Sequence, residues 1–193
     1  MYKALVALFT VATLLTGCAG VRLVDSQVNS FAPAPVPTGS RYRFERLPSQ
    51  QTHAEAQALL ETMAEQALTK VGLTRDDEAA RYSVQVSVTQ FAQQQLLGHP
   101  GLGWHLGWRM HGGMAFGHGG LLPGLDERTL YWRKIDLIMR DRCTQAVVFE
   151  SHAVHEDPWS DSDAILPAML DAALLGFPNP PTGTRQVDIE IAR

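Results

Sequence analysis

The stretch Tyr82-Ser83-Val84-Gln85-Val86-Ser87-Val88-Thr89 alternates apolar and polar side chains without a break. Neighbouring side chains of a β-strand point to opposite faces of the sheet, so this period of two predicts a strand with one apolar face and one polar face. The apolar face is expected to pack on a core, and the Ser, Gln and Thr face is expected to meet water.

The segment before this strand has the pattern of an amphipathic helix that covers the apolar face. Thr52 and Glu55 have the spacing of a capping box, in which each side chain bonds the backbone N–H of the other residue. An apolar stripe follows, made of Ala56, Leu59, Leu60, Met63, Ala67 and Val71. The residues expected to face water are Glu61, Glu65 and Gln66. Gly72 is expected to end the helix in a left-handed conformation.

The remaining elements are predicted from similar patterns. Further strands are expected at 21–31, 41–45, 129–140, 146–154 and 186–191. The short link between the third and fourth of these predicts a hairpin. A second amphipathic helix is expected to begin near residues 160–163 and to end at Gly176, with Pro167 tolerated in its first turns.

Together these elements predict an α+β fold. We expect a two-layer sandwich of about six mostly antiparallel strands, with two amphipathic helices packed on one face. A single domain is expected over residues 21–193. The chain has a hydrophobic content of 45% and a formal net charge of −4 without a basic run, so nucleic acid is not an expected partner.

The N-terminal residues 1–17 have the pattern of a secretory signal. The apolar run from Ala4 to Leu15 is too short to span a bilayer, which takes about 20 residues. It ends in Leu15-Thr16-Gly17-Cys18, which resembles the lipobox of bacterial lipoproteins. We therefore expect residues 1–17 to be removed, the sulfur of Cys18 to be acylated, and residues 18–20 to form a short tether to membrane lipid.

Three parts of the mature chain carry a family resemblance. They are Val21-Arg22-Leu23-Val24-Asp25, the stretch YRFERLPSQQ at residues 42–51, and Phe177-Pro178 followed by Gly183-Thr184-Arg185-Gln186-Val187. Together they resemble proteobacterial lipoproteins that carry domain of unknown function 4136. The resemblance covers nearly the whole mature chain and brings no catalytic residues. By similarity to other lipoproteins, Ala19 after the acylated Cys implies sorting to the outer membrane, with the folded domain in the periplasm.

Residues 93–128 are predicted to form a long Gly-, His- and Trp-rich loop, because periodicity is lost there and glycine is frequent. Its four histidines are His99, His105, His111 and His118. Imidazoles bind zinc, copper or nickel, so these residues are candidate metal ligands, and the alternative is a solvated loop of biased composition. Its candidate membrane or partner contacts are Trp104, Trp108 and Phe116. The alternative for these aromatic residues is a lid over a sheet edge.

A titratable cluster at Glu150, His152, His155, Glu156 and Asp157 is the candidate for acid–base chemistry. Strand geometry argues against it, because Glu150 and His152 share a face while His155 points to the other. Since Cys18 is expected to carry lipid, Cys143 is expected to be an unpaired thiol.

No signature of a hydrolase elbow, a phosphate loop, a dinucleotide fold or a zinc protease is present in the sequence. The sequence therefore predicts a non-catalytic outer-membrane lipoprotein without a cofactor, which binds another envelope component. The alternative is a metal or small-ligand binder that uses the histidine-rich loop.

Overall fold

The computed structural model describes residues 20–97 and 126–192. In chain order its strands and helices are β1 (Val21–Phe31), β2 (Arg41–Phe44), α2 (Pro48–Gln51), α3 (Ala54–Lys70), β3 (Thr74–Arg75), β4 (Tyr82–Leu97), β5 (Asp126–Asp141), β6 (Val147–Asp157), α4 (Ser162–Leu174) and β7 (Arg185–Ala192).

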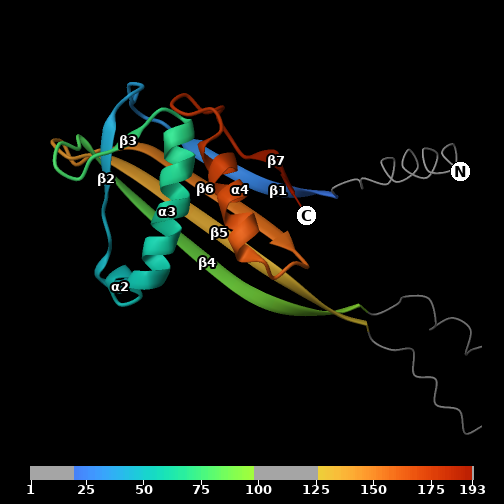
Figure 1. The fold of residues 1–193 in the computed structure, drawn as a ribbon. Coiled ribbons are helices and arrows are strands. Elements are labelled where there is room, and N and C mark those ends of the chain that lie inside the picture. The colour runs from blue at the N-terminus through green and yellow to red at the C-terminus, as the bar shows by residue number, and fades with distance from the viewer. Residues whose placement is uncertain (1–19, 98–125, 193) are drawn as a thin grey trace, which may run out of the picture.

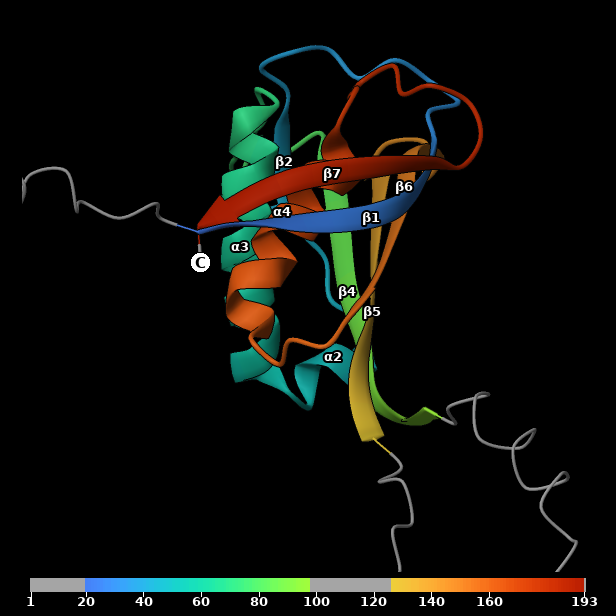
Figure 2. The same cartoon turned by 90° about the vertical axis from the view of Figure 1, so that its right-hand side faces the viewer.

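The strands form one seven-stranded sheet in the order β3-β2-β4-β5-β6-β1-β7. The long helices α3 and α4 lie against each other on one face of this sheet, and in the described residues the other face carries no helix (Figures 1 and 2). The α+β class and the position of the two long helices are therefore confirmed. The strand count differs from the predicted six, because β3 has two residues and gives no periodic signal.

The sheet is mixed rather than wholly antiparallel. β2 pairs in parallel with both β3 and β4, whereas the other strand pairs are antiparallel. The predicted hairpin is confirmed as β5 and β6, which pair from Tyr131↔Asp157 to Arg140↔Val147.

The core lies between the central strands and the two long helices. The sheet contributes Val84, Val86, Ile135, Leu137, Met139 and Phe149, all buried. The helices contribute Leu60, Ala64, Leu68, Ile165, Met169 and Leu170. The alternating residues of β4 thus pack as the sequence predicts, with their apolar side chains under the helices.

The start of α3 differs from the sequence prediction. The helix begins at Ala54 without a side-chain cap, so the predicted capping box of Thr52 and Glu55 is wrong. The Thr52 hydroxyl instead donates to the Ser49 carbonyl oxygen at 2.6 Å. The reason is the short helix α2 directly before it, where the Gln50 side chain accepts from the Leu47 N–H at 2.8 Å.

The buried face of α3 also differs from the predicted stripe. Glu61 is predicted to face water, but it is only 4% exposed, whereas the predicted core residue Leu59 is 54% exposed. Arg46 accounts for the burial of Glu61, because its Nε and Nη2 donate to the two carboxylate oxygens at 2.6 and 2.7 Å. A carboxylate can be buried when a cation pairs with it, whereas burial of an unpaired carboxylate costs too much free energy.

The strands β4 and β5 extend further than predicted. They pair with each other from Tyr82↔Asp141 to Leu97↔Asp126, so residues 93–97 and 126–128 of the predicted loop belong to strands. The last pair of β5 with β6 is Tyr131↔Asp157. Beyond this pair, β4 and β5 continue alone as a two-stranded ribbon that projects from the body (Figure 1).

Gly72 and Gly183 provide a matched test of backbone strain, since both have positive φ angles, +86° and +88°. A side chain costs about 1–2 kcal/mol in this conformation. A Cβ at Gly72 would also lie 2.9 Å from the Thr38 methyl group, whereas the space around Gly183 is open. We expect Gly72→Ala to lower the free energy of unfolding more than Gly183→Ala does, as measured by urea denaturation. The additional loss at Gly72 should disappear in a Thr38→Ser background, because that change removes the methyl group. If the difference between the two glycine variants stays the same, this explanation is wrong.

Candidate functional site

A buried guanidinium lies where β5, β6 and the start of α4 meet. Arg133 is 1% exposed. Its Nε donates to the Ser162 hydroxyl oxygen at 3.1 Å, and its Nη2 donates to the Trp159 carbonyl oxygen at 2.6 Å. Its Nη1 donates to Asp157 Oδ1 at 3.0 Å, which pairs the buried charge. Arg133 therefore ties the end of the sheet to the segment that leads into α4.

Sequence analysis named Asp157 and His155 but missed Arg133, although the sequence carries a signal for it. Arg133 stands in phase with the core residues Ile135 and Leu137 of β5, so the alternation directs a charged side chain to the helix-covered face. A charge at a core position requires a partner of opposite charge. Asp157, the last residue of β6, supplies it.

His155 extends the same cluster towards β1. Its Nε2 lies 3.0 Å from Asp157 Oδ2, and its Nδ1 lies 2.7 Å from the Asp25 carbonyl oxygen. The pairing of β1 with β6 ends at Gln27↔Val154. The buried imidazole therefore bridges the two strands just beyond the point where their backbone pairing ends.

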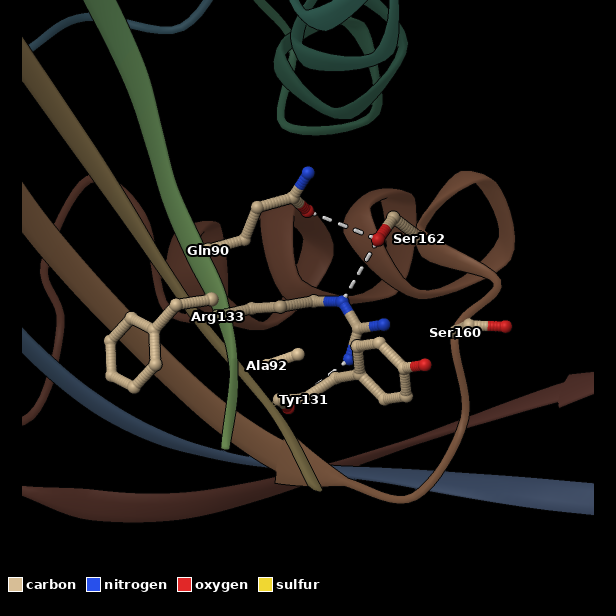
Figure 3. Close-up of a pocket in the computed structure, with 7 residues that line it drawn as sticks. Gln90, Ala92, Tyr131, Arg133, Ser160 and Ser162 are labelled. Carbon is tan, nitrogen blue, oxygen red and sulfur yellow. Dashed lines mark hydrogen bonds between the residues drawn. The ribbon is translucent and has the colours of Figure 1, made fainter. Parts of the chain in front are cut away.

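A cavity of about 280 Å³ opens beside Arg133 (Figure 3). Its lining residues are Gln90, Phe91, Ala92, Tyr131, Arg133, Ser160 and Ser162. The Ser162 hydroxyl donates to Gln90 Oε1 at 3.1 Å, while its oxygen accepts from Arg133. The hydroxyl therefore contacts an amide and a guanidinium, neither of which is a general base, and the cavity offers polar contacts for binding.

The first residues of the domain are joined to the same region. Arg22 forms two bonds to the Asp161 carboxylate, at 3.1 and 2.9 Å, and its guanidinium lies 5.5 Å from the centre of the Trp159 ring. The hydrogen bond from Arg22 lowers the pKa of Asp161. The start of β1 is thus fixed to the N-terminal end of α4.

The predicted titratable cluster is divided between the two faces, as strand alternation implies. On the open face, His152 Nε2 lies 2.8 Å from Glu150 Oε1, and its Nδ1 contacts the Asp136 carboxylate. Lys134 Nζ pairs with the same carboxylate at 2.7 Å. His155 lies on the helix-covered face.

A stacked aromatic pair lies on the open face beside this ionic chain. Phe91 and Trp132 are opposite each other in the β4–β5 pairing, with ring centroids 4.8 Å apart and an interplanar angle of 22°. Phe91 remains 50% exposed. The sequence analysis missed this pair, because the two residues become neighbours only through the strand register.

Several sequence-predicted site residues lie outside the described residues. They are the lipidation site Cys18, the histidines His99, His105, His111 and His118, and the aromatic residues Trp104, Trp108 and Phe116. Cys143 is exposed in the β5–β6 turn. In residues 20–97 and 126–192, no three His, Cys, Asp or Glu side chains are grouped to hold a metal ion. No helix in these ranges is long and apolar enough to cross a membrane.

The fold and these contacts define a two-layer α+β domain with a polar cluster at one end of its sheet and, in residues 20–97 and 126–192, no helix on the second sheet face. Residues 26–179 match the family described as Domain of unknown function (DUF4136), and the chain belongs to this family. No curated protein matches the chain.

The chain matches two solved structures at low sequence identity. A PDZ domain protein from Parabacteroides distasonis is 13% identical, with a TM-score of 0.50 over 95% of this chain and 42% of that one. The chain thus spans less than half of that protein. The PelC dodecamer from Paraburkholderia phytofirmans is 15% identical, with a TM-score of 0.40 over 77% of this chain and 95% of that one.

Removal of the buried guanidinium should be costly. Arg133→Met removes the fully buried cation and leaves the mostly buried Asp157 with His155 but without that cation, so we expect a loss towards the cost of a broken buried pair, about 3–5 kcal/mol. The matched control is Arg41→Met, which breaks the exposed pair with Asp76, where such pairs contribute at most about 1 kcal/mol. Urea denaturation of both variants measures the difference. Equal losses would show that the Arg133 contacts do not stabilise the fold.

Proposed function

We propose that this protein is a non-catalytic lipoprotein of the outer membrane whose periplasmic domain binds another envelope protein through its open sheet face. The observation that carries the proposal is the Phe91–Trp132 stack, with Phe91 half exposed, on the face opposite α3 and α4. Aromatic side chains are enriched in protein interfaces because they bury a large area with few rotatable bonds.

The surroundings of the stack suit a protein partner. Asp136 is bonded to both Lys134 and His152, and Glu150 is bonded to His152. Lys134 thus neutralises Asp136, whereas the exposed Glu156, directly opposite Trp132 in the β5–β6 pairing, is the charge that a partner covering the aromatic rings would meet. An apolar centre beside a polar rim is the usual arrangement of a protein interface.

A binding role also agrees with the contacts of the candidate catalytic groups. Ser162 bonds Gln90 and Arg133, whereas His155 bonds Asp157 and the Asp25 carbonyl oxygen. A nucleophilic serine needs a base within hydrogen-bond reach. In these contacts the serine and the imidazole each have other partners.

The proposed lipid anchor places the domain close to a membrane. Only two residues separate Cys18 from Val21, the first residue of β1, and an extended chain spans about 3.5 Å per residue, so the start of β1 stays within roughly 10 Å of the Cα atom of Cys18. The bonds of Arg22 to Asp161 fix this end of the strand to the body. A short tether on a rigid attachment point limits how far the open face can turn.

The open face is tested by cross-linking in living cells. We expect a photoreactive residue at Gln93, which lies next to Phe91 on the same face of β4, to form a covalent adduct with another envelope protein, and Phe91→Ala to reduce that adduct at least several-fold, because it removes half of the stack. The control is Leu59→Ala, which removes an equally exposed apolar side chain from α3 on the other side of the sheet. An adduct that survives Phe91→Ala, or that Leu59→Ala reduces equally, would contradict the proposed face.

The anchor is tested separately by mass spectrometry and fractionation. The mature protein should begin at an acylated Cys18 and sediment with outer membranes. Cys18→Ser should leave an unacylated chain in the soluble or uncleaved fraction, because the acyl chains then have no attachment point. The Cys143→Ser variant is the control for loss of a thiol. An intact N-terminal Met on an unmodified wild-type chain would overturn the proposed location.

A further inference from the structure

The strand β4 loses one of its two neighbours halfway along its length. β2 pairs with β4 only from Tyr42↔Tyr82 to Phe44↔Val84, and the Glu45 N–H then donates to the Val84 carbonyl oxygen at 2.9 Å. From Gln85 to Leu97, β4 pairs with β5 alone in the described part of the chain. This second half of β4 forms a border of the sheet (Figure 1), and we call it the β4 border.

The direction of the free backbone groups follows from the contacts at its start. The Val86 carbonyl oxygen points outward, because it accepts from Gln50 Nε2 at 2.8 Å and from Gln57 Nε2 at 3.1 Å. Backbone groups alternate in direction along a strand, so the N–H and C=O groups of Val88, Gln90 and Ala92 also point outward. Among the described residues, no backbone group pairs with them there.

The composition of the β4 border contrasts with that of β7, the outer strand at the opposite side of the sheet. The sixteen residues of β4 include no charged residue, proline or glycine. β7 carries Arg185, Asp188 and Glu190. Natural proteins protect sheet borders from unwanted pairing with charges and prolines. β7 has that protection, and the β4 border lacks it.

The surface beside the β4 border is hollowed at both ends of the free stretch. The cavity of about 280 Å³ lies next to Gln90 and Ala92. A second cavity of about 260 Å³ lies between β4 and the α2–α3 corner, lined by Ser87, Val88, His53 and Gln57 among others. The side chains of an added strand therefore have space on the helix-covered side.

We propose that the β4 border pairs with the β4 border of a second copy of this chain. The two strands run antiparallel about a two-fold axis at Gln90, so that Gln90 faces Gln90 and Val88 faces Ala92. This register brings outward-pointing residues opposite each other and ends before Val86, whose carbonyl oxygen is already occupied. It also sets Phe91 opposite Thr89, an aromatic and β-branched pair that stabilises antiparallel sheets.

The absence of charge makes the β4 border self-complementary. When a strand with charged residues pairs with its own copy, like charges come close to each other. The residues from Val88 to Ala92 carry no charge, so their self-pairing causes no such repulsion. Self-pairing at β7 in a register centred on Ile189 would set Asp188 against Glu190. The inference is independent of the proposed function, since side-by-side pairing leaves the open face of each copy uncovered.

The experiment places one cysteine on the proposed axis of the full chain in its native membrane. With Cys143→Ser as background, Gln90→Cys should give a disulfide-linked dimer as the main product under mild oxidation. Directly opposite residues in such a pair have Cα atoms about 5.5 Å apart, within the range of a disulfide. The control is Asp188→Cys in the same background, which should stay monomeric and also reports any reaction through Cys18. A monomeric Gln90→Cys protein, or an adduct of Gln90→Cys with a different protein, would overturn the self-pairing.

A charge-swap pair guards against misfolding of a single variant. Gln90→Lys and Gln90→Glu should each reduce the solution mass from two chains to one, because like charges meet at the axis. Mixing the two variants should restore a dimer that contains one copy of each, as measured by light scattering. Variants that dimerise separately as well as the wild type does, or a mixture that stays monomeric, would exclude Gln90 as the axis.

Discussion

The antiparallel pairing of β4 with β5 is the contact on which the other elements depend. It runs from Tyr82↔Asp141 to Leu97↔Asp126, and β2 and β6 attach to its two outer sides. It also presents Val84, Val86, Ile135 and Leu137 to the helices. The entropy cost of closing a loop grows only slowly with its length, so the burial of these side chains can hold the pair together across a long insertion.

Three polar contacts fix how the helices sit on this pair. Apolar packing has little directionality, so a helix can slide on a flat apolar face at small cost. α3 is held by Glu61 on Arg46 and by Gln57 on the Val86 carbonyl oxygen. α4 is held by Ser162 on Arg133. Each of these bonds can form at only one position of its helix, because a shift of the helix would leave a polar group without its partner.

The sequence predicted the parts of the fold that depend on local periodicity. The period of two identified β4, and the intervals of three and four identified α3. It failed where a side chain bonds a partner outside its own predicted element. Glu61 was predicted to be a surface residue, but its bond to Arg46 allows it to be buried. Thr52 was predicted to cap α3, but its hydroxyl bonds the Ser49 carbonyl oxygen of α2.

The same limit applies to the candidate site. Arg133 could have been found from its phase in β5, because a charge at a core position demands a partner. The partner Asp157 and the Ser162 contact depend on where β6 ends and α4 begins, which periodicity does not determine. The Phe91–Trp132 stack requires the strand register, which the sequence leaves open across the long insertion between them.

The proposed pairing and the proposed binding face are connected by symmetry. A two-fold axis that relates antiparallel neighbours within one sheet stands perpendicular to that sheet, so both copies turn the same face to the same side. The two Phe91–Trp132 stacks would then lie on one continuous surface, with Phe91 of each copy directly beside the axis. A partner that meets both stacks binds the second at the high effective concentration set by the first, so a weak contact at each copy is sufficient for firm binding.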